Sequence, residues 1–317
     1  WSSDVCSSDL IKSVVGNGIK AMYSLIKKAR NINLPLDCLL AAFDIMIVPI
    51  LTYGSEVWGY EKLELIENVH LKFLKLASGL RKSTPNYMVY GEFGRTPLFV
   101  KIYKKMLSFW HKLACSDLNK LSQILYKLSL LHYNETHTQY TWIHFIKCLL
   151  DKIGLSEVFV NPSICSTPYL VSRADQILTD QFIQQWRENI RLSSKGKYYQ
   201  HYKHSLTFES YLLQPWYIYY PILKFRTLNI NIPIETGRWQ NIPREERLCK
   251  LCNLGSIGDE FHYIFHCPLL NQCRSSCLPK LSITDHSLSR IFNSCDSTEM
   301  KKLSKFLITL QNVISKR

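Results

Sequence analysis

Apolar residues recur at intervals of three and four along most of the chain, which is the spacing of one face of an α-helix. In residues 11–30 this stripe ends at Lys27, Lys28 and Arg30, and cations suit a helix C-terminus. Residues 61–77 carry a second stripe, which Gly79 ends. Further helices are predicted over residues 99–113, 118–131, 140–153, 172–192, 287–293 and 299–315. Residues 216–228 are apolar and aromatic, with an interruption at Pro221. Because strand-like alternation is scarce, the predicted fold class is mainly α.

The most apolar run covers residues 34–53. Asp37, Asp44 and Pro49 interrupt it, so it predicts a buried helix and no membrane span. Asn33 is a suitable cap for this helix, with Pro35 in its first turn.

The chain divides into five ranges. Residues 1–10 (WSSDVCSSDL) resemble the translation of a sequencing adapter and are excluded from the fold. We expect the natural protein to continue upstream of residue 11, since no initiator Met is present. The other ranges are a helical bundle (11–116), a helical linker region (117–228), a metal-knuckle region (229–285) and closing helices (286–317). The two prolines in 161–168 also make that segment a boundary candidate.

The composition is strongly basic. Lys plus Arg number 39 against 25 Asp plus Glu in 317 residues, a net charge of +14. This surplus indicates a polyanionic partner, with nucleic acid (RNA or DNA) ahead of an acidic membrane. The cysteine count of 11 is odd and no signal peptide is visible. We therefore expect reduced thiols and an intracellular protein of cytoplasm and nucleus that is not secreted.

One stretch has metal-ligand spacing, Cys-x2-Cys-x9-His-x4-Cys. Its candidate ligands are Cys249, Cys252, His262 and Cys267. Gly255 and Gly258 permit the reversals that the intervening loop needs. Three thiolates and one imidazole are a standard tetrahedral Zn²⁺ set, and a closed set of four is structural rather than catalytic.

The fourth ligand has an alternative. His262 and His266 are four residues apart, so they would share a helix face and give a Cys2His2 set. Cys273 and Cys277 are interpreted as bystanders.

Cations and tyrosines interleave in residues 195–204, the combination that grips single-stranded nucleic acid by charge and base stacking. The candidates there are Lys195, Lys197, Tyr198, Tyr199, Tyr202 and Lys203. Alternatively, this is a polar connection whose tyrosines pack on a neighbouring helix. Lys101, Lys104 and Lys105 could follow a phosphate backbone or form an ordinary solvated face. Arg238, Arg244 and Arg247 flank the metal motif and could present cations to phosphate.

Motifs of several enzyme classes are missing from the sequence. No two aspartates are adjacent, and no cluster of carboxylates suits two-metal chemistry. No phosphate loop, Gly-x-Gly-x-x-Gly fingerprint or Gly-x-Ser-x-Gly elbow occurs. We therefore expect that this chain alone is not an enzyme.

A series of phrases, weak singly and specific together, resembles the C-terminal part of the polyprotein of non-LTR (LINE-type, jockey-like) retrotransposons. The phrases are residues 34–37 (LPLD), 48–59 (VPILTYGSEVWG), 66–70 (IENVH), 82–86 (KSTPN), 89–97 (VYGEFGRTP), 233–238 (PIETGR), 242–247 (IPREER) and 259–262 (DEFH).

This resemblance implies that residues 11 to about 113 are the thumb side of a reverse transcriptase, followed by a helical region with a CCHC zinc knuckle. The family pattern puts the knuckle ligands at Cys249, Cys252, His262 and Cys267. It implies a catalytic palm upstream as a partner, and a role for this part in gripping RNA template or DNA product during target-primed reverse transcription.

Overall fold

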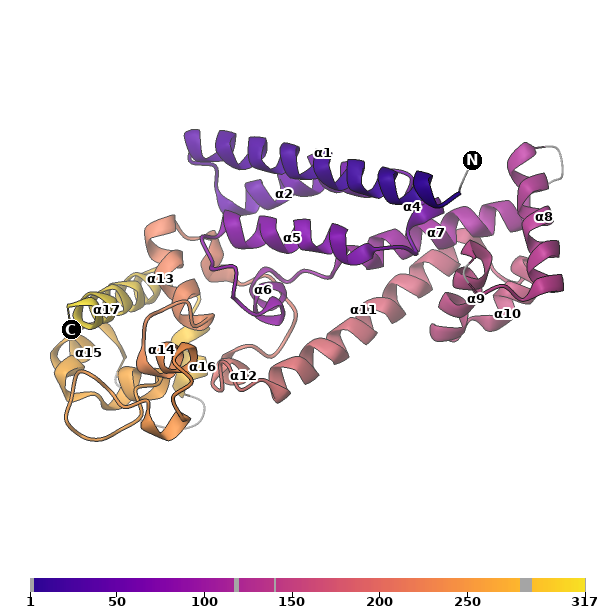
Figure 1. Ribbon diagram of the computed structural model, residues 1–317. Coiled ribbons are helices and arrows are strands. Elements are labelled where there is room, and N and C mark those ends of the chain that lie inside the picture. The colour runs from indigo at the N-terminus through magenta and orange to yellow at the C-terminus, as the bar shows by residue number, and fades with distance from the viewer. Residues whose placement is uncertain (1–2, 117–119, 140, 280–286, 317) are drawn as a thin grey trace. The chain divides into compact units, whose positions relative to one another are not determined.

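In the computed structural model nearly all regular secondary structure is helical (Figure 1), which confirms the predicted mainly-α class. It describes residues 3–116, 120–139, 141–279 and 287–316, with side chains from residue 9 onward. Within these ranges the one β-type pairing is an isolated antiparallel bridge between Leu248 and Ile257. None of the helices in the described ranges is long and apolar enough to cross a bilayer.

The chain forms two compact units that do not follow the five consecutive ranges expected from the sequence. Unit 1 contains Trp1–Ile32, Leu40–Leu71 and Thr96–Gln185, and unit 2 contains Asn33–Leu39, Lys72–Arg95 and Trp186–Arg317. The boundary candidate at residues 161–168 lies inside unit 1. Trp1 and Ser2 lie outside the described residues. The expected limit after residue 116 lies next to the undescribed residues 117–119, and the limit after residue 285 lies within the undescribed residues 280–286.

Unit 1 is a set of packed helices. Its elements are α1 (Ser3–Asn31), most of α2 (Leu36–Met46), α3 (Val48–Leu51), α4 (Ser55–Trp58), the first part of α5 (Leu63–Ala77), α7 (Leu98–Cys115), α8 (Leu121–Thr136), α9 (Trp142–Lys152), α10 (Ser156–Val160), the 3-10 turn η1 (Pro162–Ile164) and most of α11 (Thr167–Leu192). Helix α1 therefore includes most of the adapter-like residues.

Glycines allow close approach between the helices of unit 1. A Cβ on Gly18 of α1 would lie 2.3 Å from Leu51 Cδ2 of α3. A Cβ on Gly59, after α4, would lie 2.4 Å from Ile102 Cγ2 of α7. Trp142 Nε1 also donates to the carbonyl oxygen of Glu56 at 2.9 Å, so α9 is tied to α4.

Unit 2 carries the metal motif. Its elements are the end of α5, α6 (Asn86–Phe93), the end of α11, α12 (Tyr199–Tyr202), the 3-10 turn η2 (Ser210–Leu213), α13 (Trp216–Arg226), α14 (Pro233–Trp239), the 3-10 turn η3 (Arg244–Glu246), the π-helical turn η4 (His262–His266), the 3-10 turn η5 (Pro268–Leu270), α15 (Asn271–Cys277), α16 (Ser287–Phe292) and α17 (Ser297–Ser315). Helix α13 packs along α17, where Ser304 Oγ donates to the carbonyl oxygen of Tyr217 at 3.0 Å.

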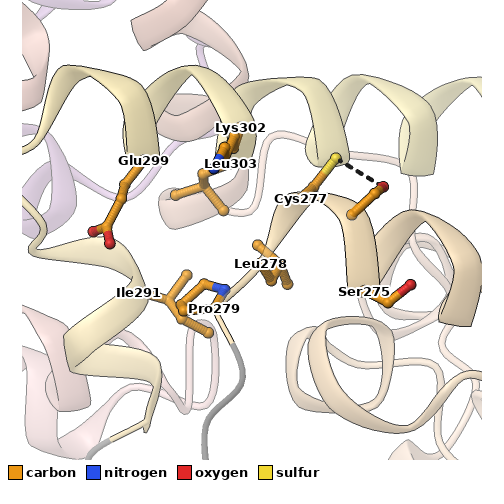
Figure 2. A pocket seen from close by; sticks show the side chains of 9 residues that line it. Ser275, Cys277, Leu278, Pro279, Ile291, Glu299, Lys302 and Leu303 are labelled. Atoms are coloured by element: carbon orange, nitrogen blue, oxygen red, sulfur yellow. Dashed lines mark hydrogen bonds between the residues drawn. The ribbon is translucent and has the colours of Figure 1, made fainter.

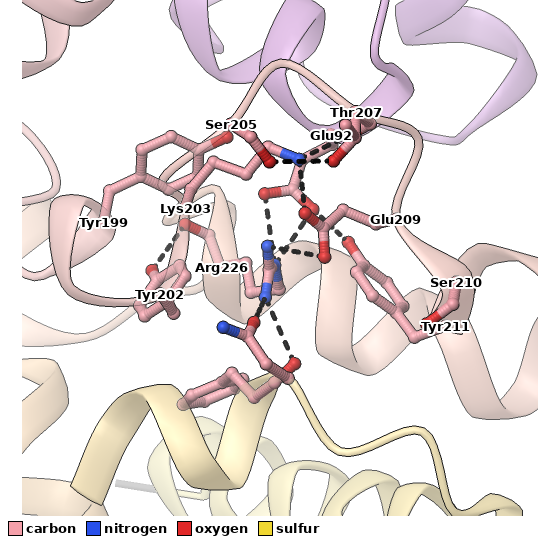
Figure 3. Close-up of polar contacts among 12 residues, drawn as sticks. Glu92, Tyr199, Tyr202, Lys203, Ser205, Thr207, Glu209, Ser210, Tyr211 and Arg226 are labelled. Carbon is pink, nitrogen blue, oxygen red and sulfur yellow. Dashed lines mark hydrogen bonds and ion pairs between the residues drawn. The ribbon is translucent and has the colours of Figure 1, made fainter. Parts of the chain in front are cut away.

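A buried charge network joins distant segments of unit 2 (Figure 3). The Arg226 guanidinium lies between Glu92 and Glu209, at 2.9 Å (Nε to Oε2) and 3.1 Å (Nη2 to Oε2). Tyr211 donates to Glu92, and the Lys203 ammonium pairs with Glu209. Buried charges require such partners, so this network fixes α6, η2 and α13 together.

Most of the chain forms helices where the sequence pattern predicts them. Residues 99–113 fall within α7, and residues 172–192 fall within α11, where Phe182 and Trp186 are buried as expected. The single helix expected from Asn33 to about Pro49 is instead divided into α2 and α3. Asn33 adopts a positive φ of 48°, so it is a turn residue before α2.

Candidate metal centre

The first two candidate ligands lie in a short hairpin loop that the Leu248–Ile257 bridge closes. Cys249 N–H donates to the Ser256 carbonyl oxygen and Gly258 N–H to that of Arg247, both at 2.8 Å. Gly255 has a φ of +64°, which lets the chain reverse within this loop. The hairpin therefore returns the chain to the side of Cys249.

In the turn after Cys249, a backbone N–H group points at the Cys249 sulfur. Leu251 N–H donates to Cys249 Sγ at 3.4 Å. An N–H aimed at a sulfur stabilises the thiolate form, which is the form that binds a metal.

The other two ligands come from the turn η4. Asp259 precedes this turn, and its Oδ1 accepts the His262 N–H at 3.0 Å. At its end Cys267 N–H donates to the His262 carbonyl oxygen at 2.8 Å, a bond that spans five residues. This wide turn brings residue 267 back to the side of residue 262.

The structure brings all four predicted ligands together. The ligand atoms of Cys249, Cys252, His262 and Cys267 lie within 4.8 Å of one another, and all four residues are buried. Cys252 Sγ is 3.4 Å from His262 Nε2. Ligand atoms around a tetrahedral ion with bonds of about 2.0–2.3 Å are separated by about 3.3–3.8 Å. A buried Cys3His group of this geometry could bind a metal ion.

The alternative fourth ligand does not join this cluster. His266 is exposed and its ring packs against Phe261 with centroids 5.3 Å apart, whereas Cys267 is fully buried. Cys273 and Cys277 also lie outside the group. The geometry thus favours Cys267 over His266, as the spacing and the resemblance both indicated.

The electrostatics of the cluster favour a bound cation. Burial, followed by the charge of neighbouring Cys249, raises the pKa of the Cys267 thiol to about 12. Burial also lowers the pKa of His262, which keeps its imidazole neutral and able to coordinate. Three crowded thiols and a neutral imidazole form a site that a divalent cation stabilises.

Residues outside the motif hold the ligands in place. The Arg274 guanidinium donates to three backbone carbonyl oxygens around η4, those of Ile264 (2.7 Å), Cys267 (2.9 Å) and Tyr263 (3.3 Å). Arg274 lies outside the predicted motif, because ligand spacing contains no signal for it. Its partners are backbone atoms, which any sequence supplies.

The cations near the centre bind acidic or backbone groups of the protein. Arg244 pairs with Asp259 at 3.6 Å, and Arg238 donates to the Ser194 carbonyl oxygen at 3.1 Å. Arg247 donates to the carbonyl oxygens of Ile242 and Ile234, at 2.8 and 3.0 Å. Arg247 is therefore a structural residue, while Arg238 and Arg244 remain half-exposed.

Three residues of the predicted binding stretch at 195–204 are buried, which corrects that expectation for them. Tyr199 is 0% exposed, while Tyr202 and Lys203 are each 3% exposed. Neither ring is open for base stacking, because both tyrosines pack inside unit 2. The Lys203 ammonium is satisfied by Glu209 and by the Thr207 carbonyl oxygen.

The rest of that stretch is less enclosed. Lys197 is exposed and lies 5.7 Å from the centroid of the half-exposed Tyr198 ring. Lys195 is paired with Glu235 at 2.8 Å. Lys197 and Tyr198 are thus the members best placed to meet a ligand.

The three candidate lysines of α7 have partners in unit 1. Lys101 pairs with Asp44 at 3.5 Å and Lys104 with Asp175 at 3.0 Å. Lys105 donates to the hydroxyl of Thr52 at 2.8 Å. A solvated face with local partners describes these lysines better than a bare phosphate track.

A separate pocket of about 210 Å³ lies between α15, α16 and α17 (Figure 2). Glu299 and Lys302 are the charged side chains that line it, together with apolar groups such as Leu278 and Ile291. Cys277 borders it, with its sulfur 3.6 Å from Ser276 Oγ. This lining supplies no paired carboxylates and no histidine for acid–base chemistry.

Comparisons of the chain with protein-family models, with curated proteins and with solved structures found no match.

Proposed function

We propose that Cys249, Cys252, His262 and Cys267 hold a structural Zn²⁺. A closed set of three sulfurs and one imidazole is a usual zinc environment, and it leaves no open position for a reacting water. Burial of all four residues supports a structural role. Since unfolded chains rarely preform such a site, metal binding would contribute directly to the folding of this part of unit 2.

We further propose that the chain is a nucleic-acid-binding module. The observation that carries this proposal is a buried Cys3His group inside a chain with a net charge of +14. Small zinc units with cations around them present charge rigidly to phosphate, and Arg238 and Arg244 lie in this position. Lys197 beside Tyr198 adds a cation and a ring.

The resemblance in sequence gives this proposal a more specific form. The chain would be the thumb and zinc-knuckle part of a non-LTR retrotransposon reverse transcriptase, gripping RNA template or DNA product during target-primed reverse transcription. The residues that geometry selects as ligands are those that the family pattern selects. Phosphoryl transfer would belong to the palm of the parent polyprotein.

Filter binding of the purified chain to a labelled single-stranded RNA at two salt concentrations tests the proposal. We expect affinity to fall steeply with salt, because Lys and Arg that neutralise phosphates release counterions. Affinity that is absent or independent of salt would contradict a nucleic-acid-binding function.

A second candidate is a zinc-stapled interaction protein with no catalytic role. An apolar stripe on α8 favours it, because the stripe is exposed to solvent at Leu121 (71%), Leu125 (54%), Leu128 (57%) and Leu131 (58%). Contiguous exposed apolar surface commonly marks a protein interface. Under this alternative the four-ligand site would bind zinc equally well, but the chain would not retain RNA at physiological salt.

A further inference from the structure

Two cations of unit 2 were not among the nucleic-acid-binding candidates selected from the sequence. Arg81 and Lys224 have no carboxylate partner anywhere in the described part of the chain. Arg81 Nη2 instead donates to the amide oxygen of Asn231 at 2.6 Å. Their charge is therefore available to an outside anion, unlike that of Lys195 or Lys104.

Both cations line one small pocket. Its volume is about 80 Å³, enough for a phosphate group. Gln311 of α17 also lines it, together with other polar residues and the apolar Ile230, Ile232, Leu310 and Ile314. Gln311 Nε2 is buried and has no hydrogen-bond partner within the described ranges. Two cations and a glutamine with an unused buried N–H donor thus lie around the same space, and this set of groups suits an anionic oxygen.

The charges around the pocket repel each other. Burial, followed by the positive charge of Arg81, lowers the pKa of the Lys224 ammonium. An anion between the two side chains would offset both effects. The free protein therefore carries an electrostatic cost here that a bound phosphate would relieve.

Aromatic rings flank each cation. The Arg81 guanidinium lies 5.1 Å from the Trp239 ring centroid, and the Lys224 ammonium lies 5.2 Å from that of Tyr220. Trp216 stacks on Tyr220 with centroids 4.0 Å apart. Trp216 is 49% exposed and Trp239 is 54% exposed, so both present indole surface to solvent.

The backbone of unit 2 fixes this arrangement. Gly79 has a φ of +71°, and a Cβ there would lie 2.9 Å from both Trp216 and Tyr220. Asn229 Oδ1 accepts from the Arg81 N–H at 3.0 Å and from Thr84 Oγ1 at 2.9 Å. The loop that carries Arg81 is thus held against the end of α13.

We propose that Arg81, Lys224 and Gln311 bind one backbone phosphate of a single-stranded nucleic acid, whose neighbouring bases stack on Trp239 and on the Trp216–Tyr220 pair. The proposal rests on the proposed function and names the place where it acts. Single-stranded binders combine cations for the backbone with aromatic platforms for bases, and the order ring, cation, pocket, cation, ring has this form. A duplex keeps its bases stacked on each other, so it would not use the rings.

Fluorescence anisotropy of the full chain with labelled single-stranded U8 and T8 tests this site. Trp239→Ala and Trp216→Ala should each weaken binding about 5- to 150-fold. Arg81→Gln and Lys224→Gln should weaken it and each lower the salt slope by about one. Tyr53→Ala and Lys301→Gln remove an exposed ring and an exposed charge elsewhere, so they should leave affinity close to that of the unaltered chain.

The outcomes separate the site from the function. Circular dichroism first establishes that each variant keeps its helical content. Salt-dependent binding that the four site variants leave unchanged would overturn the site and leave the proposed function standing. Equal losses in the site variants and the two controls would also overturn it, because the effect would then reflect general charge and surface. Failure of the unaltered chain to bind either oligomer would overturn both proposals.

Discussion

Glu92 and Arg226 form an ion pair in which both side chains are 0% exposed, although 134 residues separate them in the sequence. Arg226 Nε lies 2.9 Å from Glu92 Oε2 and 3.1 Å from Oε1, so a single N–H is shared between both carboxylate oxygens. The same guanidinium also donates to the Phe292 carbonyl oxygen before α17. A cation at this position connects α6, α13 and α16.

Removing the cation should leave a buried carboxylate without its partner. We expect Arg226→Met to lower the free energy of unfolding by about 3–5 kcal/mol, the usual cost of breaking a buried pair on one side. Urea unfolding followed by helical circular dichroism measures this loss. The combined variant Glu92→Gln with Arg226→Met should recover part of it, because the unpaired charge is then gone.

An exposed pair on α11 provides the control for that measurement. Arg191 donates to Glu188 at 2.6 Å on the surface, where water screens both charges. Arg191→Met should therefore leave the unfolding midpoint close to that of the unaltered chain. Equal midpoints for the Arg226 and Arg191 variants would show that the buried network does not stabilise unit 2.

Substitutions of the adjacent residues Cys267 and His266 should have opposite effects on zinc binding. Cys267 is buried with the other ligands, whereas His266 is exposed. Cys267→Ser should therefore lose bound zinc, while His266→Asn should retain one zinc ion per chain. Mass spectrometry of metal content after gel filtration measures both, and Cys273→Ser is the thiol control. Zinc retained by the Cys267 variant and lost by the His266 variant would contradict the Cys3His set.

The four clustered residues could be singled out from the sequence because metal motifs constrain spacing tightly. The choice between His266 and Cys267 could not be derived from helix periodicity, since an α-helix would have placed His262 and His266 on one face. The segment is instead a π-helical turn, closed by the hydrogen bond from Cys267 N–H to the His262 carbonyl oxygen. Tertiary packing decides that local geometry.

The environment of the side chains in residues 195–204 was harder to predict for a different reason. Lysine and tyrosine suit both a surface that binds nucleic acid and a buried network, because each side chain combines an apolar body with a polar tip. Lys203 is buried beside Glu209, and the buried Tyr199 hydroxyl donates to the Met88 carbonyl oxygen of α6. Met88 is more than a hundred residues away from Tyr199, and local sequence cannot show that pairing.

Gly258 allows the metal hairpin to lie close to α14. A Cβ at this position would lie 2.8 Å from Pro233 Cγ and 3.1 Å from Cys249 Cα. Gly258→Ala should therefore displace the backbone of a ligand, with a cost of about 1–3 kcal/mol, and weaken zinc affinity. Zinc transfer to a chromogenic chelator measures the affinity.

Gly16 of α1 is the matched glycine for this test. A Cβ there would meet nothing within 4 Å, and alanine is favoured over glycine in a helix interior. Gly16→Ala should leave zinc affinity unchanged and keep or raise the unfolding midpoint. If both alanine variants released zinc alike, the close contact at Gly258 would have no part in shaping the site.

Arg274 should tune the metal site without touching a ligand atom. Its guanidinium holds the carbonyl oxygens of Tyr263, Ile264 and Cys267, so it fixes the path of the chain between the third and fourth ligands. Loss of groups that orient metal ligands costs about 10–100-fold in affinity, and we expect Arg274→Ala to fall in that range.

Arg290→Ala removes an exposed arginine of α16 and should leave the affinity unchanged. Competition with the same chelator gives both values, and because Arg274→Ala keeps all four ligands, the variant should still bind one zinc ion at saturation. A variant that bound no zinc at any concentration would show that Arg274 is needed to fold η4, and one with unaltered affinity would show that the ligands orient themselves without it.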